Sequence, residues 1–452
     1  MIKYKNMKIK VTILVFCCFA FIANSQEIEV LTLKNAVNYA LENKADAKKS
    51  KLEIENSEYQ IQEIRSRALP HISANGGLTY NPILQKSVID GEFFGQPGEV
   101  IEVNFGQKWY TGVGVSLSQT IFDQSVFTGL KAANSTREFY RINDQLTQEM
   151  VIERVANNYY QVYVQRQNLK AHDSNLANTI KVKNIIQGRF NNGLAKKIDL
   201  DRILVKISNI NTERQRVINV IQLRENSLKF YMGMPIETQI QIPETEFDVT
   251  LQTMGSPPNA AKRSEYLLLK KQEELLSFQK KDMEAKYYPT LSLAGGYTYV
   301  GQGLDVPWFK SEEHGVYWSD FSSISLNLNI PVFTGFNTQA KVRQANIDLK
   351  MIQEDLANTK LALDLDYENA KTQQINNIIT INNQKENIKL AQDVLKNTNN
   401  NYLQGLASLT DLLDAENAST EAKNNFLFAV LQFKLAEIQL LKSRGELKTL
   451  TY

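Results

Sequence analysis

Residues 68–80 read Ala-Leu-Pro-His-Ile-Ser-Ala-Asn-Gly-Gly-Leu-Thr-Tyr, and residues 287–299 read Tyr-Tyr-Pro-Thr-Leu-Ser-Leu-Ala-Gly-Gly-Tyr-Thr-Tyr. In each stretch a proline, which cannot continue a helix, is followed by alternating apolar and small or polar residues. Such alternation has the period of a β-strand. Each stretch therefore predicts a helix end and then a strand, and their close match indicates that the chain is an internal duplication.

Two more motifs recur further along the chain. Gln119-Thr-Ile-Phe122 corresponds to Ile330-Pro-Val-Phe333, and Asn192-Gly-Leu-Ala195 with a following Asp-Leu corresponds to Gln404-Gly-Leu-Ala407 with its own Asp-Leu. The first copy is eight residues longer between its first two motifs, which predicts a variable loop there. Both halves then have the same order: helix, strand, loop, strand, long helix, tight turn and helix.

The predicted helices are amphipathic and unusually long. Apolar residues recur at about every 3.6 positions, while Asn, Gln, Lys and Glu fill the remaining faces. The predicted ranges are Leu33–Arg67, Phe127–Gly188 and Asp199–Met232 in the first half, and Lys262–Lys286, Phe336–Asn401 and Ser408–Leu447 in the second. At ~1.5 Å per residue each middle helix reaches on the order of 90–100 Å. In each half the two shorter helices together match the long one, which suggests two short rods stacked end to end beside it.

Four strands carry one apolar face and one small, polar face. They are predicted at Ile72–Tyr80, Gly112–Ile121, Leu291–Tyr299 and Ser323–Ile330. With 8–10 residues each, they are close to the roughly 9–11 residues of a tilted membrane strand. Aromatic residues gather at one end of these strands, as in an interfacial girdle: Tyr80, Trp109, Tyr110, Tyr297, Tyr299, Trp318 and Phe321. A half-buried sheet of a water-soluble protein would show the same alternation.

A membrane sheet of four strands cannot stand alone. Its two edges would leave backbone groups without hydrogen bonds in lipid, and membrane barrels begin at about eight strands. Several copies must therefore share one barrel, although strand count alone does not fix the number of copies.

The amino-terminal residues predict export. Four lysines in residues 1–10 precede an apolar run to Ala23, and small residues precede Gln26, so residues 1–25 have the layout of a signal peptide. The apolar run is too short for the alternative, a membrane anchor of ~20 residues. Both cysteines, Cys17 and Cys18, fall inside this segment, so disulfides and thiolate sites are excluded from the mature chain. The mature chain carries a net charge of −2, which does not indicate nucleic-acid binding.

Across nearly all of its mature length the chain resembles the TolC family of outer-membrane efflux and secretion ducts. The resemblance rests on the duplication, the corner Ile330-Pro-Val-Phe-Thr-Gly335 and the turn that runs from Tyr402 to Ala415. It implies a homotrimer with a shared 12-stranded membrane β-barrel, a 12-helix periplasmic tunnel and an equatorial collar. The implied repeats are residues 26–232 and 264–452, and the collar is drawn from residues 233–263 and the C-terminal residues.

The resemblance also implies a periplasmic gate. The family's two constricting aspartates match Asp411 and Asp414, and a tyrosine that hydrogen-bonds an aspartate of the first repeat matches Tyr402 and Asp199. An arginine that braces the gate in the best-known member is replaced here by Ala407. The alternative for the two aspartates is helix capping, because acids in a first turn favour the helix dipole. For Tyr402 the alternative is plain packing.

The implied partners are a periplasmic adaptor and an inner-membrane pump, since a duct of this kind is passive. The adaptor would dock on the two tips, at Gly193 and Leu194 and at Gly405 and Leu406. The alternative for these motifs is a simple turn between two helices, which also favours glycine. No enzyme motif is present, and the three histidines have no metal-ligand spacing, so neither catalysis nor a cofactor is expected. Two functions stay open: an export channel for small molecules or secreted proteins, and a helical adaptor or structural protein without a pore.

Overall fold

The computed structural model describes residues 30–95, 97–243 and 259–451. The predicted signal peptide and the middle of the predicted collar, residues 244–258, lie outside the described residues. The helices are α2 (Leu33–Asn43), α3 (Ala45–Ser66), α4 (Gln124–Asn191), α5 (Lys197–Met232), α6 (Ser264–Ala285), α7 (Asn337–Leu403) and α8 (Leu409–Arg444). The strands are β1 (His71–Tyr80), β2 (Gln85–Asp90), β3 (Val100–Phe105), β4 (Trp109–Phe122), β5 (Thr290–Gly303) and β6 (Val316–Asn329).

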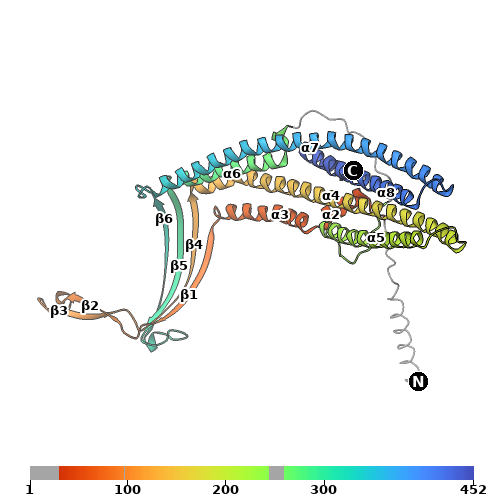
Figure 1. Ribbon diagram of the computed structural model, residues 1–452. Coiled ribbons are helices and arrows are strands. Elements are labelled where there is room, and N and C mark those ends of the chain that lie inside the picture. Colours follow the sequence, from red (N-terminus) through yellow and green to blue (C-terminus); the bar gives the residue numbers. More distant parts are fainter. Residues whose placement is uncertain (1–29, 96, 244–258, 452) are drawn as a thin grey trace, which may run out of the picture. The chain divides into compact units, whose positions relative to one another are not determined.

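The predicted duplication is confirmed element by element (Figure 1). The order α3–β1–β4–α4–α5 of the first half returns as α6–β5–β6–α7–α8 in the second. The two long helices, α4 and α7, have 68 and 67 residues. Within the described ranges no helix combines the length and the apolar character that crossing a bilayer requires.

The first helix differs from its prediction, because it is interrupted at Lys44. This residue is extended (φ −65°, ψ 134°), so α2 and α3 are separate helices. The buried Lys44 ammonium donates a hydrogen bond of 3.0 Å to the carbonyl of Phe230 and lies 3.8 Å from the centre of the Phe230 ring. A cation at the last carbonyls of α5 is favourable, and this contact replaces the continuation of one helix.

The described part of the chain forms two compact units. Among the described residues, one unit combines residues 30–49, 146–243, 259–260 and 363–451, and holds α2, α5, α8 and the tip ends of α4 and α7. The other lies within residues 50–145 and 261–362, and holds most of α3, α6 and the six strands that the structure describes. The backbones of α4 and α7 run from one unit into the other.

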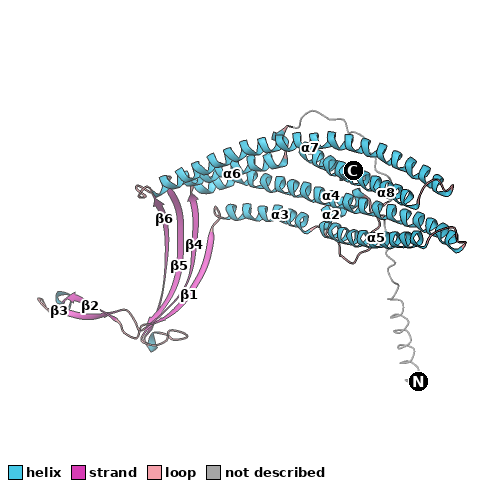
Figure 2. Cartoon of the chain, in the orientation of Figure 1, coloured by secondary structure: helices cyan, strands magenta, loops and turns pink. Residues whose placement is uncertain are grey.

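The sheet has the strand order β1–β4–β5–β6, and every neighbouring pair is antiparallel (Figure 2). Its register places the apolar residues of all four strands on one face, for example Ile72 opposite Leu117 and Leu293 opposite Leu326. Serine, glycine, threonine and asparagine fill most of the other face. The predicted two-faced sheet is therefore confirmed, with β1 and β6 at its edges.

The aromatic residues pair at one end of this sheet. Tyr80 lies opposite Trp109, with ring centres 4.5 Å apart. Tyr299 stacks on Trp318 at 4.9 Å, and the Trp318 ring covers Gly301, where a Cβ would lie 2.9 Å from the indole. Glycine in this strand leaves room for the tryptophan of the next one.

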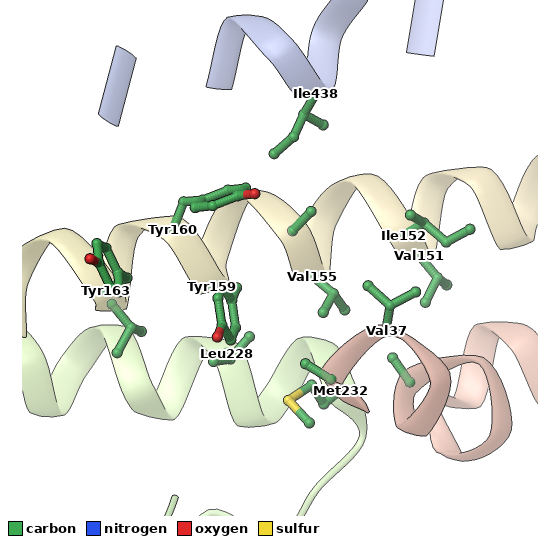
Figure 3. Close-up of a cluster of buried hydrophobic side chains, with 14 of the residues drawn as sticks. Val37, Val151, Ile152, Val155, Tyr159, Tyr160, Tyr163, Leu228, Met232 and Ile438 are labelled. Carbon is green, nitrogen blue, oxygen red and sulfur yellow. The ribbon is translucent and has the colours of Figure 1, made fainter. Parts of the chain in front are cut away.

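The unit that holds the tips has its main core around α4 (Figure 3). Tyr159 of α4 is packed against α5 beside Leu228, and its hydroxyl donates to the carbonyl of Leu31 at 3.1 Å. Burial raises the pKa of Tyr159 to about 12. Ile242, from the predicted collar, and Leu447, near the C-terminus, are buried in the same cluster. Segments far apart in the sequence thus share one hydrophobic core.

Candidate channel entrance

Two helical hairpins form the tips of this unit, and their turns are built alike. In the first, Gly193 is left-handed (φ 73°) and the backbone N–H of Leu194 donates to the carbonyl of Arg189 at 2.8 Å. In the second, Gly405 is left-handed (φ 79°) and the N–H of Leu406 donates to the carbonyl of Asn401 at 2.8 Å. Both turns are glycine-capped helix ends of the Schellman type.

The side chains after the two glycines are open to solvent in the described chain. Leu194 is 78% exposed and Leu406 is 75% exposed. A large apolar side chain at the outermost point of each hairpin is unfavourable in water.

Asp411 closes the first turn of α8 as part of a capping box. Its carboxylate accepts hydrogen bonds from the backbone N–H of Ser408 (2.9 Å) and from the Ser408 hydroxyl (2.8 Å), while the Ser408 oxygen accepts from the N–H of Asp411 (3.1 Å). These hydrogen bonds from Ser408 lower the pKa of Asp411. The capping alternative is therefore present, and it also keeps this carboxylate charged at neutral pH. Asp414 is exposed one turn further on the same helix face.

Tyr402 packs into a small core between the hairpins, with Ile186 of α4 and Leu412 of α8. Burial raises the pKa of Tyr402, the negative charge of Asp199 adds to the rise, and Arg189 opposes it. The structure thus brings Tyr402 and Asp199 into electrostatic range, and the packing alternative applies to this tyrosine. The hydrogen bond between the two side chains stays a prediction.

Basic residues of the first hairpin, which the sequence did not single out, reach across to the second. Arg189 donates to the carbonyl of Leu403 at 3.1 Å, and its guanidinium lies 5.3 Å from the centre of the Tyr402 ring. Arg202 of α5 donates to the hydroxyl of Thr410 at 3.2 Å. Ala407, which replaces the family's bracing arginine, cannot make such contacts. Arg189 and Arg202 connect the two hairpins instead.

Lys206 of α5 faces the acidic side of α8. Its ammonium donates to the side-chain oxygen of Asn417. Burial lowers the pKa of Lys206, while the nearby carboxylates of Glu416 and Asp414 oppose that effect. No sequence motif marks Lys206.

The comparisons with known proteins decide the family. The model of the outer membrane efflux protein family matches residues 36–233 and 279–446. The chain belongs to this family. As an outer membrane efflux protein it is a passive outer-membrane protein and not an enzyme, as the sequence predicted. No cluster of metal-ligating side chains occurs in the part of the chain that the structure describes.

Individual relatives of this efflux protein are distant but cover most of it. The outer membrane protein TolC of Vibrio cholerae is 23% identical over 347 residues, covering 74% of this chain and 76% of that protein. TolC of Escherichia coli is 20% identical over 402 residues, covering 86% and 77%.

Solved structures share the fold. The outer membrane protein VceC of Vibrio cholerae matches with a TM-score of 0.71 at 16% identity, covering 91% of this chain and 96% of that one. The CmeC outer membrane channel of Campylobacter jejuni matches with a TM-score of 0.71 at 16% identity, covering 94% and 90%. The predicted fold class, with duplicated strands and long helices of a TolC-like channel, is confirmed.

Proposed function

We propose that three copies of this efflux protein form one outer-membrane channel, which receives cargo from an inner-membrane pump through a periplasmic adaptor. The observation that carries the proposal is the sheet: an apolar face and two edges that have no strand partner among the described residues. Ile324 is 85% exposed and Leu326 is 64% exposed on that face. Lipid would cover such a face, and neighbouring copies would pair its edges.

Three copies would give a 12-stranded barrel and a 12-helix tunnel, as the family resemblance implies. In this arrangement residues 26–232 and 264–452 are the two repeats and residues 233–263 the equatorial linker. The bridge between Val30 and Gln241 and the burial of Ile242 support a structured collar at the start of that linker.

Cysteine crosslinking of the sheet edges tests the shared barrel. The predicted mature chain contains no cysteine, so Ser73→Cys in β1 can be combined with single cysteines at Ser323, Ser325 or Asn327 in β6. Oxidation should produce covalent trimers, seen on denaturing gels. If every pair stayed monomeric while unoxidised samples ran as heat-sensitive oligomers, the proposed edge pairing would be wrong; a purely water-soluble monomer would favour the adaptor-type protein instead.

At the entrance we propose that Asp411 and Asp414 face the lumen, with Tyr402 and Asp199 among the contacts that hold the second hairpin. In a trimer six carboxylates would then surround one constriction and attract cations. We expect Asp411→Ala/Asp414→Ala channels in planar bilayers to lose cation preference and block by multivalent cations. Ser408→Ala serves as the control, since it removes the cap but keeps both charges. Unchanged cation preference in the double variant would rule out the acidic constriction.

We further propose that an adaptor docks on Gly193, Leu194, Gly405 and Leu406. A photo-crosslinking residue at Leu406 should capture a periplasmic adaptor, identified by mass spectrometry, whereas the same residue at the exposed Leu390 of α7 should not. An adaptor of a proton-driven pump would indicate small-molecule efflux, and one of an ATP-driven system would indicate protein secretion. Capture at Leu390 alone would contradict docking at the tips.

A further inference from the structure

A cavity of about 450 Å³ lies among α4, α7 and α8, within the unit that holds the tips. One part of its lining is apolar, from Val182, Leu395 and Leu412. Amides and hydroxyls of the same three helices also line it, among them Asn175, Asn399 and Ser419. Concave sites of about 300–1,000 Å³ with apolar walls and a few polar groups are the usual form of small-molecule sites.

Three lysines, one from each helix, border this cavity: Lys181 of α4, Lys396 of α7 and Lys423 of α8. Within the described chain none of the three has an ion-pair partner, although other cations of the same unit do, such as Arg214 with Asp173. Three ammonium groups without an ion-pair partner around one concave site favour the binding of an anion.

Glu416 is the single acid among the lining residues, and its carboxylate has partners that do not line the cavity. It is 5% exposed, and its carboxylate accepts a hydrogen bond of 3.4 Å from the hydroxyl of the buried Thr179. The cation that acts on it is Lys206, which comes from α5 and does not line the cavity. The three lining lysines therefore remain available to a ligand.

We propose that this cavity binds a small amphipathic organic anion. The carboxylate or sulfonate head would lie among Lys181, Lys396 and Lys423, and the apolar body would lie on Val182, Leu395 and Leu412. Because the ligand would contact α4, α7 and α8 together, it would link the two hairpins. This site is separate from the acidic pair at Asp411 and Asp414, and the inference does not depend on the exported cargo.

Photoaffinity labelling of the full chain in detergent-free lipid nanodiscs tests the site. The probe is 4-benzoylbenzoate, compared with 4-benzoylbenzylamine and uncharged benzophenone, which share its aromatic body. We expect the carboxylate probe to label peptides of residues 171–185, 392–403 and 412–423, and decanoate to compete. We expect the amine probe to label these peptides weakly, because three ammonium groups repel it.

Charge variants identify the residues responsible. Lys181→Gln/Lys396→Gln/Lys423→Gln should raise the dissociation constant of 4-benzoylbenzoate by about tenfold or more. The matched control Lys183→Gln/Lys385→Gln/Lys389→Gln removes the same charge from lysines of α4 and α7 that do not line the cavity, and should change little. Glu416→Gln should tighten binding, since it removes the one negative charge.

Four results would overturn the proposal. The first three are equal labelling by all three probes, equal effects of the two triple variants, and labelling mapped outside the three helices. A fourth is capture of the probe only when an adaptor is bound, because the cavity would then be part of a protein interface. If the triple variant fails to form the native oligomer, the three single substitutions are measured, and each should weaken binding.

Discussion

Replacing Leu326 with arginine is expected to prevent assembly in the outer membrane, whereas arginine at the adjacent Ser325 should permit it. Leu326 lies in β6 on the apolar face, opposite Leu293 and 64% exposed. Ser325 lies on the other face, opposite Ala294. An arginine on the lipid-facing side of a membrane strand costs about 2–4 kcal/mol near the bilayer centre, and every copy in the channel would carry it. On the face that we assign to the lumen the same side chain stays in water.

The measurement is the amount of heat-sensitive oligomer in the outer-membrane fraction, with total protein measured on the same samples. The two variants differ by one position in the same strand, so expression, export and strand propensity are closely matched. Loss of oligomer for Leu326→Arg with retention for Ser325→Arg assigns the apolar face to lipid. The reverse result would mean that the sheet faces the other way, and equal loss in both would leave the faces undistinguished and contradict a wet lumen lined by Ser325.

The sheet was the most predictable part of the molecule, because alternation fixes which residues share a face. It could not reveal one local irregularity. The register shifts between Thr120 and Phe122, so that Phe122 and not Ile121 pairs with Leu291. A bulge inserts one residue into one strand, and two neighbouring apolar residues give no sign of which is the extra one.

The segment between the first two motifs was predicted as a variable loop, but it contains a hairpin of β2 and β3. Its strands have only six residues each, and apolar residues occur on both faces, with Ile89 opposite Ile101 and Val88 opposite Glu102. Without a single apolar face, the period of the sequence does not distinguish such strands from a loop.

At the tips the turns and the first helical residues were predictable, whereas the contacts between hairpins were not. Glycine followed by a capping Ser-x-x-Asp pattern marks Gly405 and the start of α8. The partners of Tyr402, Glu416 and Lys206 depend on how two hairpins about two hundred residues apart in sequence pack together, and no local pattern carries that information. The break at Lys44 could not be predicted for the same reason, because its partner Phe230 lies far away in sequence, in α5.

Gly233→Ala is expected to destabilise the unit that holds the tips by about 2–5 kcal/mol, far more than Gly193→Ala. Both glycines have φ +73°, so alanine at either position adopts the left-handed region at a cost of roughly 1–2 kcal/mol. At Gly193 a Cβ would meet no atom within 4 Å. At Gly233 it would lie 2.8 Å from the carbonyl oxygen of Asn43 and 2.9 Å from the Cα of Lys44, and backbone atoms cannot move aside as a flexible side chain can. Overpacking of this kind adds about 1–3 kcal/mol.

Thermal unfolding followed by circular dichroism measures the difference between the two variants, with the backbone strain shared and the collision present only at Gly233. A much lower melting temperature for Gly233→Ala would mean that the close contact between the end of α5 and the break between α2 and α3 stabilises this unit. Equal melting temperatures would show that this close approach contributes nothing to stability. Lys44→Met removes the hydrogen bond to Phe230 but leaves the close contact at Gly233 intact. We therefore expect it to lower the melting temperature less than Gly233→Ala does. Since α2 and the end of α5 share one core with Tyr159 and Leu228, a loosened junction should also expose that core and lower the cooperativity of unfolding.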